Sequence, residues 1–103
     1  HFFETMIYMH LRIASELMAP KAKVFYWRTT SGKEVDFVLE HGRRLLVLEA
    51  KIKPNPTLSD AKNLLNFIEE NPQAIMGVVL HSGDAIKWLH SKILSVPWWW
   101  IFQ

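Results

Sequence analysis

The sequence predicts an α/β fold, with a mixed, mainly antiparallel sheet flanked by two helices. Along its 103 residues, some segments repeat apolar side chains every three or four residues, which is typical of helices. Other segments alternate apolar and polar side chains, which is typical of strands. The predicted order of elements is helix, three strands, helix and two strands. Half of the residues are hydrophobic and 21% are charged, which excludes a disordered chain and indicates one packed core. We therefore expect residues 1–103 to form a single domain.

The first predicted helix covers residues 2–18 and precedes three predicted strands. An apolar stripe recurs along it at three- and four-residue spacing, and Pro20 interrupts the pattern. The strand-like segments, rich in β-branched, aromatic or alternating apolar side chains, are residues 24–27, 34–40 and 45–51. Turn-forming residues at 30–33 and 41–42 separate them, so we expect an antiparallel meander of three strands.

The second predicted helix begins after Thr57, whose hydroxyl is a helix-capping group. Asp60 places a negative charge in the first turn, where the helix dipole favours it, and Pro72 ends the helical pattern. Residues 75–80 form a strongly apolar run, as expected of a strand covered on both faces. A turn then leads to a short strand at residues 85–89, the last that the sequence predicts.

The composition excludes several kinds of site. The chain has no cysteine, so disulfides, thiolate-bound metals and a cysteine nucleophile are excluded, and a cytoplasmic location is expected. The longest apolar run is far shorter than the about 20 residues of a membrane-spanning helix, so we expect no membrane partner. The formal net charge of +2 permits a nucleic-acid partner without requiring one.

The start of the chain and its glycines indicate what else the whole protein contains. The first residue is His1, and a helical pattern follows at once, so we expect a C-terminal fragment of a longer protein. The four glycines are isolated and form no phosphate-binding loop. ATP, if the protein uses it, is therefore expected only at another domain.

The residues with the strongest chemical signal lie on the second and third predicted strands. Residues two apart on a strand face the same side, so Glu49 and Lys51 project together. If residues 41–42 form the hairpin loop, Asp36 lies opposite Val47 and diagonal to Glu49, at roughly 7–8 Å. A slip of one residue would place the two carboxylates on opposite faces.

Two carboxylates beside a lysine are suited to metal-dependent phosphodiester hydrolysis. Carboxylate oxygens are ligands for Mg²⁺, which polarises a phosphate and acidifies a bound water, and a lysine orients that water or neutralises charge. Glu4, on the first helix, is a candidate for a further contact through water. The alternative is that Glu49 and Lys51 form a solvated strand end and that Asp36 points outward.

The sequence also resembles a known family of uncharacterised domains. The segments that carry the resemblance are YWRT at 26–29, SGKEVDFVL at 31–39, EAK at 49–51 and PWW at 97–99. In that family the domain follows an N-terminal AAA+-type ATPase domain in bacterial and archaeal proteins, and it is similar to the PD-(D/E)xK, restriction-endonuclease-like superfamily. The resemblance implies that superfamily's αβββαβ core, although the proline of the motif's name is replaced by Val35.

The resemblance also implies a set of site residues and a cofactor. Mg²⁺ or Mn²⁺ would be bound, and the implied positions are Asp36 and Glu49 as metal-ligating and catalytic carboxylates, Lys51 as the catalytic lysine, the backbone carbonyl of Ala50 as a ligand, and Glu4 as the helix acid. The first functional hypothesis is therefore a Mg²⁺-dependent nuclease domain that acts on DNA. The second is an inactive module that binds nucleic acid or forms a homodimer and tethers the ATPase domain.

Other residues have structural interpretations that compete with functional ones. Residues 98–100 are three tryptophans, which are expected to cover the core or a partner rather than to stack on bases. His81 ends a predicted strand and is expected to have a structural role. Basic residues near the third strand are candidates for binding a phosphate backbone, and they are Arg43, Arg44, Lys51 and Lys53.

Overall fold

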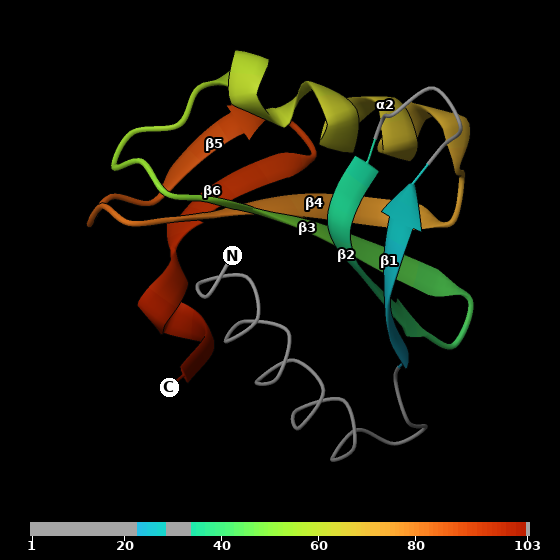
Figure 1. Ribbon diagram of the computed structural model, residues 1–103. Coiled ribbons are helices and arrows are strands. Elements are labelled where there is room, and N and C mark those ends of the chain that lie inside the picture. The colour runs from blue at the N-terminus through green and yellow to red at the C-terminus, as the bar shows by residue number, and fades with distance from the viewer. Residues whose placement is uncertain (1–22, 29–33, 103) are drawn as a thin grey trace.

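The computed structural model describes residues 23–28 and 34–102, in which strands form one mixed sheet (Figure 1). The strands are β1 (Lys23–Arg28), β2 (Glu34–His41), β3 (Arg44–Lys51), β4 (Ala74–His81), β5 (Lys87–His90) and β6 (Ile93–Pro97). The helical elements are the 3₁₀ helix η1 (Leu58–Ala61), the α-helix α2 (Lys62–Glu70) and the 3₁₀ helix η2 (Trp98–Phe102). The predicted first helix, with Glu4, lies outside the described residues.

The six strands are arranged in the order β1-β2-β3-β4-β6-β5. The strands β1, β2 and β3 form the predicted antiparallel meander, and β5 is antiparallel to β6. In the centre, however, β3 pairs with β4 and β4 pairs with β6 in parallel. The structure thus confirms an α/β chain with a mixed sheet. Among the described residues only one α-helix, α2, flanks it, so the expectation of two flanking helices is confirmed for one.

The strand β6 is the main element that the sequence did not predict. Residues 93–97 read ILSVP, which has neither a clear alternation nor a hydrophobic stripe. They form a strand because they enter between β4 and β5, where Ile93, Ser95 and Val96 become buried. The last predicted strand, residues 85–89, begins two residues later than expected, at Lys87.

Each face of the sheet carries its own hydrophobic core. The core beneath α2, called the helix-side core here, joins Leu64, Phe67 and Ile68 of α2 to strand residues that include Val47 and Val79. The opposite face gathers Phe37, Leu48, Leu80 and Val96. Figure 1 shows α2 lying across one face of the sheet and η2 on the other side. Strands β2, β3 and β4 are therefore covered on both faces, which explains their largely apolar sequences.

The start of the second helix agrees with its sequence signals. The backbone N–H of Thr57 donates a hydrogen bond of 2.8 Å to Oδ2 of Asp60, which is the reciprocal part of a capping box. This bond, and then the Lys53 ammonium at 3.1 Å, lower the pKa of the Asp60 carboxyl. At the other end, the side-chain amide of Asn71 donates to the carbonyl of Phe67, so α2 stops before Pro72.

The β2–β3 hairpin closes around different residues from those predicted. His41 pairs with Arg44 and Val38 pairs with Val47, so residues 42–43 form the loop. Gly42 has a φ of +66°, and a glycine with positive φ at the first loop position suits a type II′ turn. The prediction of a loop at residues 41–42 is therefore wrong. Glycine adopts positive φ at no steric cost, whereas histidine does so only at a cost, so the turn forms where glycine comes first.

The loops that follow β3 and β4 pack tightly on each other. The backbone N–H of Ser82 donates to the carbonyl of Lys53 at 3.3 Å. A Cβ atom on Gly83 would lie 2.2 Å from the carbonyl oxygen of Pro54, so only glycine permits this approach. Because both loops begin at the ends of neighbouring parallel strands, their contact fixes the edge of the sheet where β3 and β4 end.

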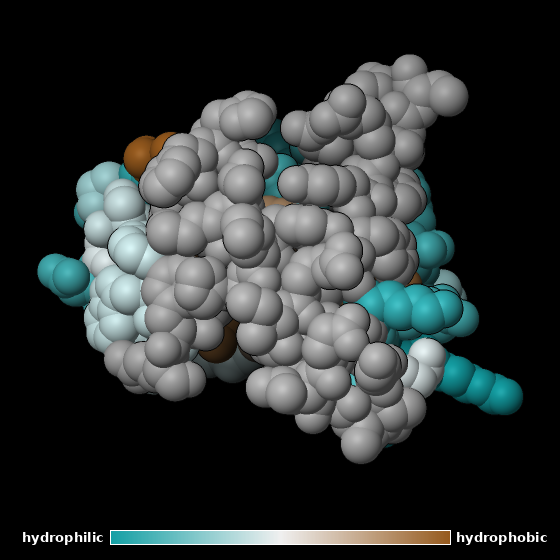
Figure 2. Space-filling view, turned by 60° about the horizontal axis from the view of Figure 1, so that its bottom comes forward, coloured by the Kyte–Doolittle hydropathy of each residue, from teal (hydrophilic) through white to brown (hydrophobic). Residues whose placement is uncertain are grey.

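Hydrophobic side chains that remain exposed are scattered over the described surface. They include Ile52, Leu58, Ile75, Ile86, Trp88, Trp99 and Trp100. In the view of Figure 2 the described residues at the margins of the molecule are mostly hydrophilic, and hydrophobic ones show only in small separate areas. None of the helices in the described segments has the length and apolar character needed to cross a membrane.

Replacing Gly83 should destabilise the fold. We expect Gly83→Ala to lower the free energy of unfolding by about 1–3 kcal/mol, the usual cost of overpacking, because the new methyl group meets backbone that cannot move aside as a side chain would. Urea denaturation followed by circular dichroism would measure the change. Ser82→Ala is the matched control, since it keeps the backbone hydrogen bond and lies at an exposed position. Equal stability of the two variants would contradict the prediction.

Candidate functional site

The candidate site lies at the carboxyl end of β3, on the face that α2 covers. Val38 and Val47 lie directly opposite each other, and both belong to the helix-side core. Asp36 lies two residues before Val38 and Glu49 lies two residues after Val47, so the alternation of side chains brings both to that same face. Lys51 follows on that face at the end of β3.

The observed register brings the two carboxylates closer than the predicted register does. The prediction set Asp36 opposite Val47, with Glu49 on a diagonal. In the structure Phe37 pairs with Leu48, so the same register carried one residue further sets Asp36 opposite Glu49. Opposite Cβ atoms in antiparallel strands are about 4.5–5.5 Å apart, against roughly 7–8 Å for a diagonal pair. A shift of two residues changes the spacing but preserves the face.

Asp36 takes the place of a backbone acceptor at the end of the β2–β3 ladder. Its Oδ2 accepts a hydrogen bond of 2.8 Å from the backbone N–H of Ala50. The N–H and C=O of one residue in a strand point to the same side, so the carbonyl of Ala50 also points towards β2. The carboxylate of Asp36 and the carbonyl of Ala50 are thus directed to the same gap between the two strands.

Glu49 is a buried carboxylate with incomplete hydrogen bonding. The residue is 5% exposed, and its Oε2 is buried with no hydrogen-bond partner within the described residues. The Lys51 ammonium lies 3.6 Å from that oxygen, which is an ion-pair distance but too long for a good hydrogen bond. The alternative of a solvated strand end is therefore wrong for Glu49.

Burial changes the acidity of Glu49. Removal from water raises the pKa of its carboxyl from 4.5 to about 7; the Lys51 ammonium acts in the opposite direction, and the charge of Asp36 raises it further. A buried carboxylate without a partner is costly, and such groups are normally compensated by hydrogen bonds or a cation. Glu49 is therefore held close to the point where it exchanges a proton near neutral pH.

The described residues fit a hydrated divalent cation better than a fully coordinated one. No group of three or more His, Asp or Glu side chains that would hold a metal occurs among residues 23–28 and 34–102. Mg²⁺ in proteins commonly takes one or two carboxylates and keeps several waters. Asp36, Glu49 and the carbonyl of Ala50 match that requirement, and the orphaned Oε2 of Glu49 is an oxygen that a cation would satisfy. The proposed contribution of Glu4 lies outside the described residues.

His81 is next to Lys51 in the sheet, but both of its ring nitrogens already form hydrogen bonds within the fold. Its Nδ1 accepts a hydrogen bond from the N–H of Gly83, so its proton is on Nε2, which donates to the carbonyl of Ala85. The residue is 1% exposed and pairs in register with Lys51. His81 therefore holds the loop that packs beside the site, in agreement with its predicted structural role.

The basic residues around β3 do not form a single patch. Arg43 and Arg44 lie at the hairpin, where β3 begins, whereas Lys51 and Lys53 lie where it ends. Seven steps of ~3.3 Å separate Arg44 from Lys51, or roughly 23 Å. Lys53 is also engaged by Asp60, with both oxygens 3.1 Å from its ammonium nitrogen. Only Lys51 of this group lies at the candidate site.

The three tryptophans differ in their packing. Trp98 packs against the core on the face opposite α2, as the core-covering interpretation predicts. Trp99 and Trp100 are exposed, and their ring centroids are 6.2 Å apart with a tilt of 44°. They lie in η2, which follows β6, and β6 is two strands from β3 in the sheet.

Among known protein families, a model described as a domain of unknown function, DUF4143, matches residues 1–101. No curated protein matches the chain.

Removing the carboxylate of Asp36 should release the backbone of Ala50. We expect Asp36→Ala to leave the Ala50 N–H without an acceptor, at a cost of about 1–3 kcal/mol, and to accelerate hydrogen exchange of that amide in NMR spectra. Asp36→Asn, which keeps an acceptor oxygen, should preserve most of the protection. If both variants exchange at the wild-type rate, the hydrogen bond does not hold β3.

The buried Glu49 should make stability fall as the pH rises towards neutrality. Its pKa is raised to about 7 from 4.5, so in this range the folded chain keeps a proton that the unfolded chain releases. The free energy of unfolding should therefore decrease between pH 4.5 and 7, by up to about 3 kcal/mol at about 1.4 kcal/mol per pKa unit.

Glu49→Gln should remove this contribution, so the variant should gain stability relative to the wild type as the pH rises. Chemical denaturation at a series of pH values would measure the difference. Glu69→Gln, the same change at an exposed position of α2, is the control. A difference between Glu49→Gln and the wild type that does not change with pH would rule out a protonated Glu49.

Proposed function

We propose that this chain, which belongs to the DUF4143 family, is a metal-dependent phosphodiesterase domain that acts on DNA. The observation that carries the proposal is Glu49, which lies on the same face as Asp36 and beside Lys51 and has one buried oxygen without a hydrogen-bond partner among the described residues. Two carboxylates on one face with a lysine beside them are suited to metal-dependent hydrolysis of a phosphodiester.

The order of elements supports a restriction-endonuclease-like core. The meander β1–β2–β3, followed by α2 and then by β4 parallel to β3, corresponds to the βββαβ part of that core. The resemblance of residues 31–39 and 49–51 to the PD-(D/E)xK superfamily points the same way. The helix that would complete the αβββαβ arrangement is the one predicted at residues 2–18.

Each residue of the candidate site has a defined role in the proposed reaction. Asp36, Glu49 and the carbonyl of Ala50 would hold Mg²⁺ or Mn²⁺, which supplies polarisation of the phosphate and an acidified water when bound. The Lys51 side chain, which is 38% exposed, is accessible to a phosphate oxygen and would neutralise its developing charge. Hydrolysis joins a water oxygen to phosphorus and breaks one phosphorus–oxygen bond of the backbone.

The surroundings of the site keep these groups in position. The hydrogen bond from Ala50 holds Asp36, and Glu49 is buried on the face against which α2 packs. The packing of Gly83 on Pro54 fixes the loop that follows Lys51. Such preorganisation lowers the cost of arranging charged groups at the moment of reaction. An N-terminal AAA+-type ATPase domain, as the resemblance implies, would bind the ATP.

An inactive module is the second candidate. Two observations favour it: the described residues include no set of three metal-binding side chains, and the pKa of Glu49 near 7 means that much of the carboxyl is protonated at neutral pH. In this case the chain would bind DNA or a second copy of itself without cleaving DNA. It predicts binding that is independent of metal and survives Glu49→Gln.

A cleavage assay distinguishes the two candidates. With single- and double-stranded DNA and Mg²⁺ or Mn²⁺, we expect cleavage by the wild type and a loss of at least about 100-fold in rate for Lys51→Ala, within the range measured for removal of one charge-stabilising group. Lys62→Ala is the matched control, because Asp60-Ala61-Lys62 is a second acidic-x-lysine triplet and its lysine is exposed at the start of α2. Equal rates for Lys51→Ala and Lys62→Ala would refute the proposed role of Lys51.

Metal binding can be tested without activity. At neutral pH, Mn²⁺ should raise the melting temperature of the wild type, because a ligand that binds only the folded state stabilises it by mass action. Glu49→Gln should abolish the rise. Metal binding without cleavage would support the inactive module, and an equal rise in Glu49→Gln would exclude Glu49 as a ligand.

A further inference from the structure

Trp99 and Trp100 expose their indole rings at the end of the sheet where the candidate site lies. They are 39% and 47% exposed, and they belong to η2, which begins directly after β6. Figure 1 shows β6 continuing into η2 at the same end of the sheet at which β3 and β4 continue into their loops. The two rings and the lysine of the candidate site are therefore displayed at one end of the sheet.

The strand pairing sets the distance between the rings and the site. Lys51 pairs with His81, and His81 pairs with Pro97, so these residues form a row across the ends of three strands. Two strand spacings, or roughly 10 Å, separate Lys51 from Pro97. The tryptophans follow Pro97 by two and three residues at a rise of ~2 Å each, which places their backbone within roughly 16 Å of Lys51. That distance corresponds to about five nucleotides of one DNA strand at ~3.4 Å each.

The packing of η2 leaves ring surface available for a ligand. Trp98 packs against the core on the face opposite α2, which anchors the start of η2. The centroids of the Trp99 and Trp100 rings are 6.2 Å apart with a tilt of 44°, so the rings are not stacked face to face. The expectation that all three tryptophans cover the core or a partner therefore leaves these two exposed rings unexplained.

The charges at the candidate site indicate why aromatic rings would matter there. Of the four basic residues around β3, Lys51 alone lies at the site, since Lys53 is engaged by Asp60. Binding that depends on phosphates needs several such residues. Stacking of a base on an aromatic ring adds affinity without charge, and every base has a face that can stack. We propose that Trp99 and Trp100 stack on unpaired bases of a single-stranded DNA whose backbone passes Lys51.

The requirement for a single strand follows from the geometry of stacking. In a duplex each base face is covered by the neighbouring base pairs, so an indole gains access only after a base is unstacked. Because η2 lies on the other side of the sheet from α2 (Figure 1), the strand would pass around the ends of β3, β4 and β6, which a flexible single strand does more easily than a duplex. The inference rests on the proposed action on DNA, and it specifies the form of the substrate.

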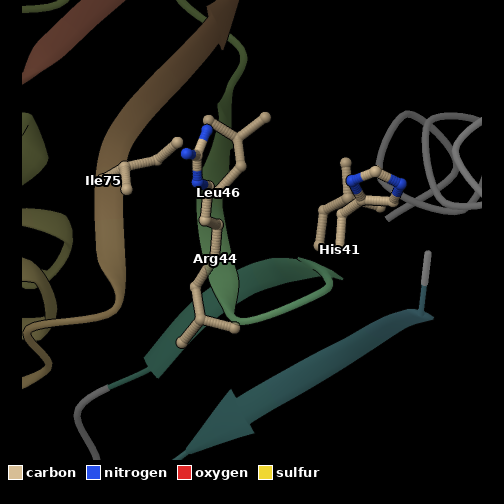
Figure 3. A pocket seen from close by; sticks show the side chains of 6 residues that line it. His41, Arg44, Leu46 and Ile75 are labelled. Carbon is tan, nitrogen blue, oxygen red and sulfur yellow. The ribbon is translucent and has the colours of Figure 1, made fainter. Parts of the chain in front are cut away.

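The opposite end of the sheet has a cavity but no comparable stacking surface. The cavity, of about 240 Å³, is lined by Leu39, His41, Arg44, Leu45, Leu46 and Ile75. Figure 3 shows Arg44, Leu46 and Ile75 on one side of it and the imidazole of His41 across from them. Its leucine and isoleucine side chains have no aromatic face for a base. DNA that extends from the candidate site therefore meets exposed indole rings towards η2 and not at the cavity.

Oligonucleotide binding by the intact chain, measured by fluorescence anisotropy in EDTA, tests the inference. We expect an oligothymidylate to bind at least about fivefold more tightly than an abasic oligonucleotide of the same length, because stacking of a single base contributes at least that factor. A duplex of the same length should bind more weakly than the single strand. Equal binding of the abasic strand would overturn base stacking, and equal or tighter binding of the duplex would overturn the preference for a single strand.

Variants of three exposed tryptophans locate the binding. Trp99→Ala and Trp100→Ala should each weaken oligothymidylate binding at least about fivefold and leave the binding of the abasic strand unaltered. Trp88→Ala is the matched control, because Trp88 is 63% exposed but lies on β5, opposite Leu94. Full binding by both η2 variants, or an equal loss in Trp88→Ala, would overturn the proposal.

NMR spectra of the wild type give a second measurement that does not depend on the folding of a variant. On titration with oligothymidylate, the indole N–H resonances of Trp99 and Trp100 should shift, whereas that of Trp88 should not. Shifts confined to Trp88 would overturn the assigned surface.

The outcome is distinguishable from that of the proposed nuclease activity, because binding in EDTA requires neither metal nor cleavage. Base-dependent binding through Trp99 and Trp100 without cleavage would support this inference together with the inactive DNA-binding module. Cleavage of DNA without base-dependent binding would support the nuclease and overturn this inference.

Discussion

The hydrogen bond from the Ala50 N–H to Asp36 connects the fold of this chain to its candidate chemistry. It lies at the point where the regular ladder between β2 and β3 ends. There a side-chain oxygen accepts the hydrogen bond that a backbone carbonyl accepts elsewhere in the ladder. The bond extends the attachment of β3 to β2 beyond the last paired residues, Phe37 and Leu48. On its other side the same end of β3 pairs with β4, where Glu49 lies opposite Val79 and Lys51 opposite His81.

The packing of α2 imposes the second constraint on the site. The helix packs on the face of the sheet on which Glu49 lies, and the burial of Glu49 raises the pKa of its carboxyl. A core that buries a carboxylate sacrifices stability unless a cation or proton compensates the charge. The same burial would strengthen the attraction between Glu49 and a bound cation, because the local dielectric is low.

The two ends of the sheet have different characters for physical reasons. At the ends of β3 and β4 the strands are in regular register, and the contact between Gly83 and Pro54 closes the loops over them. Where β4 begins, the register between β3 and β4 shifts at Ile75, and a cavity lined by basic and aliphatic side chains lies there. The sheet thus has one end closed around acidic groups and another end open beside Arg44.

The sequence by itself determined the features that depend on near neighbours in the chain. Side-chain alternation put Glu49 and Lys51 on one face, and the Thr57–Asp60 pair marked the start of the second helix. Only the tertiary structure decided the hairpin register, the insertion of β6 between β4 and β5, and the burial of Glu49. The insertion of β6 and the burial of Glu49 depend on contacts between residues far apart in sequence. The hairpin register depends on Gly42, which adopts a positive φ at no steric cost. Local patterns do not contain that information, since the same alternation is compatible with several registers and strand orders.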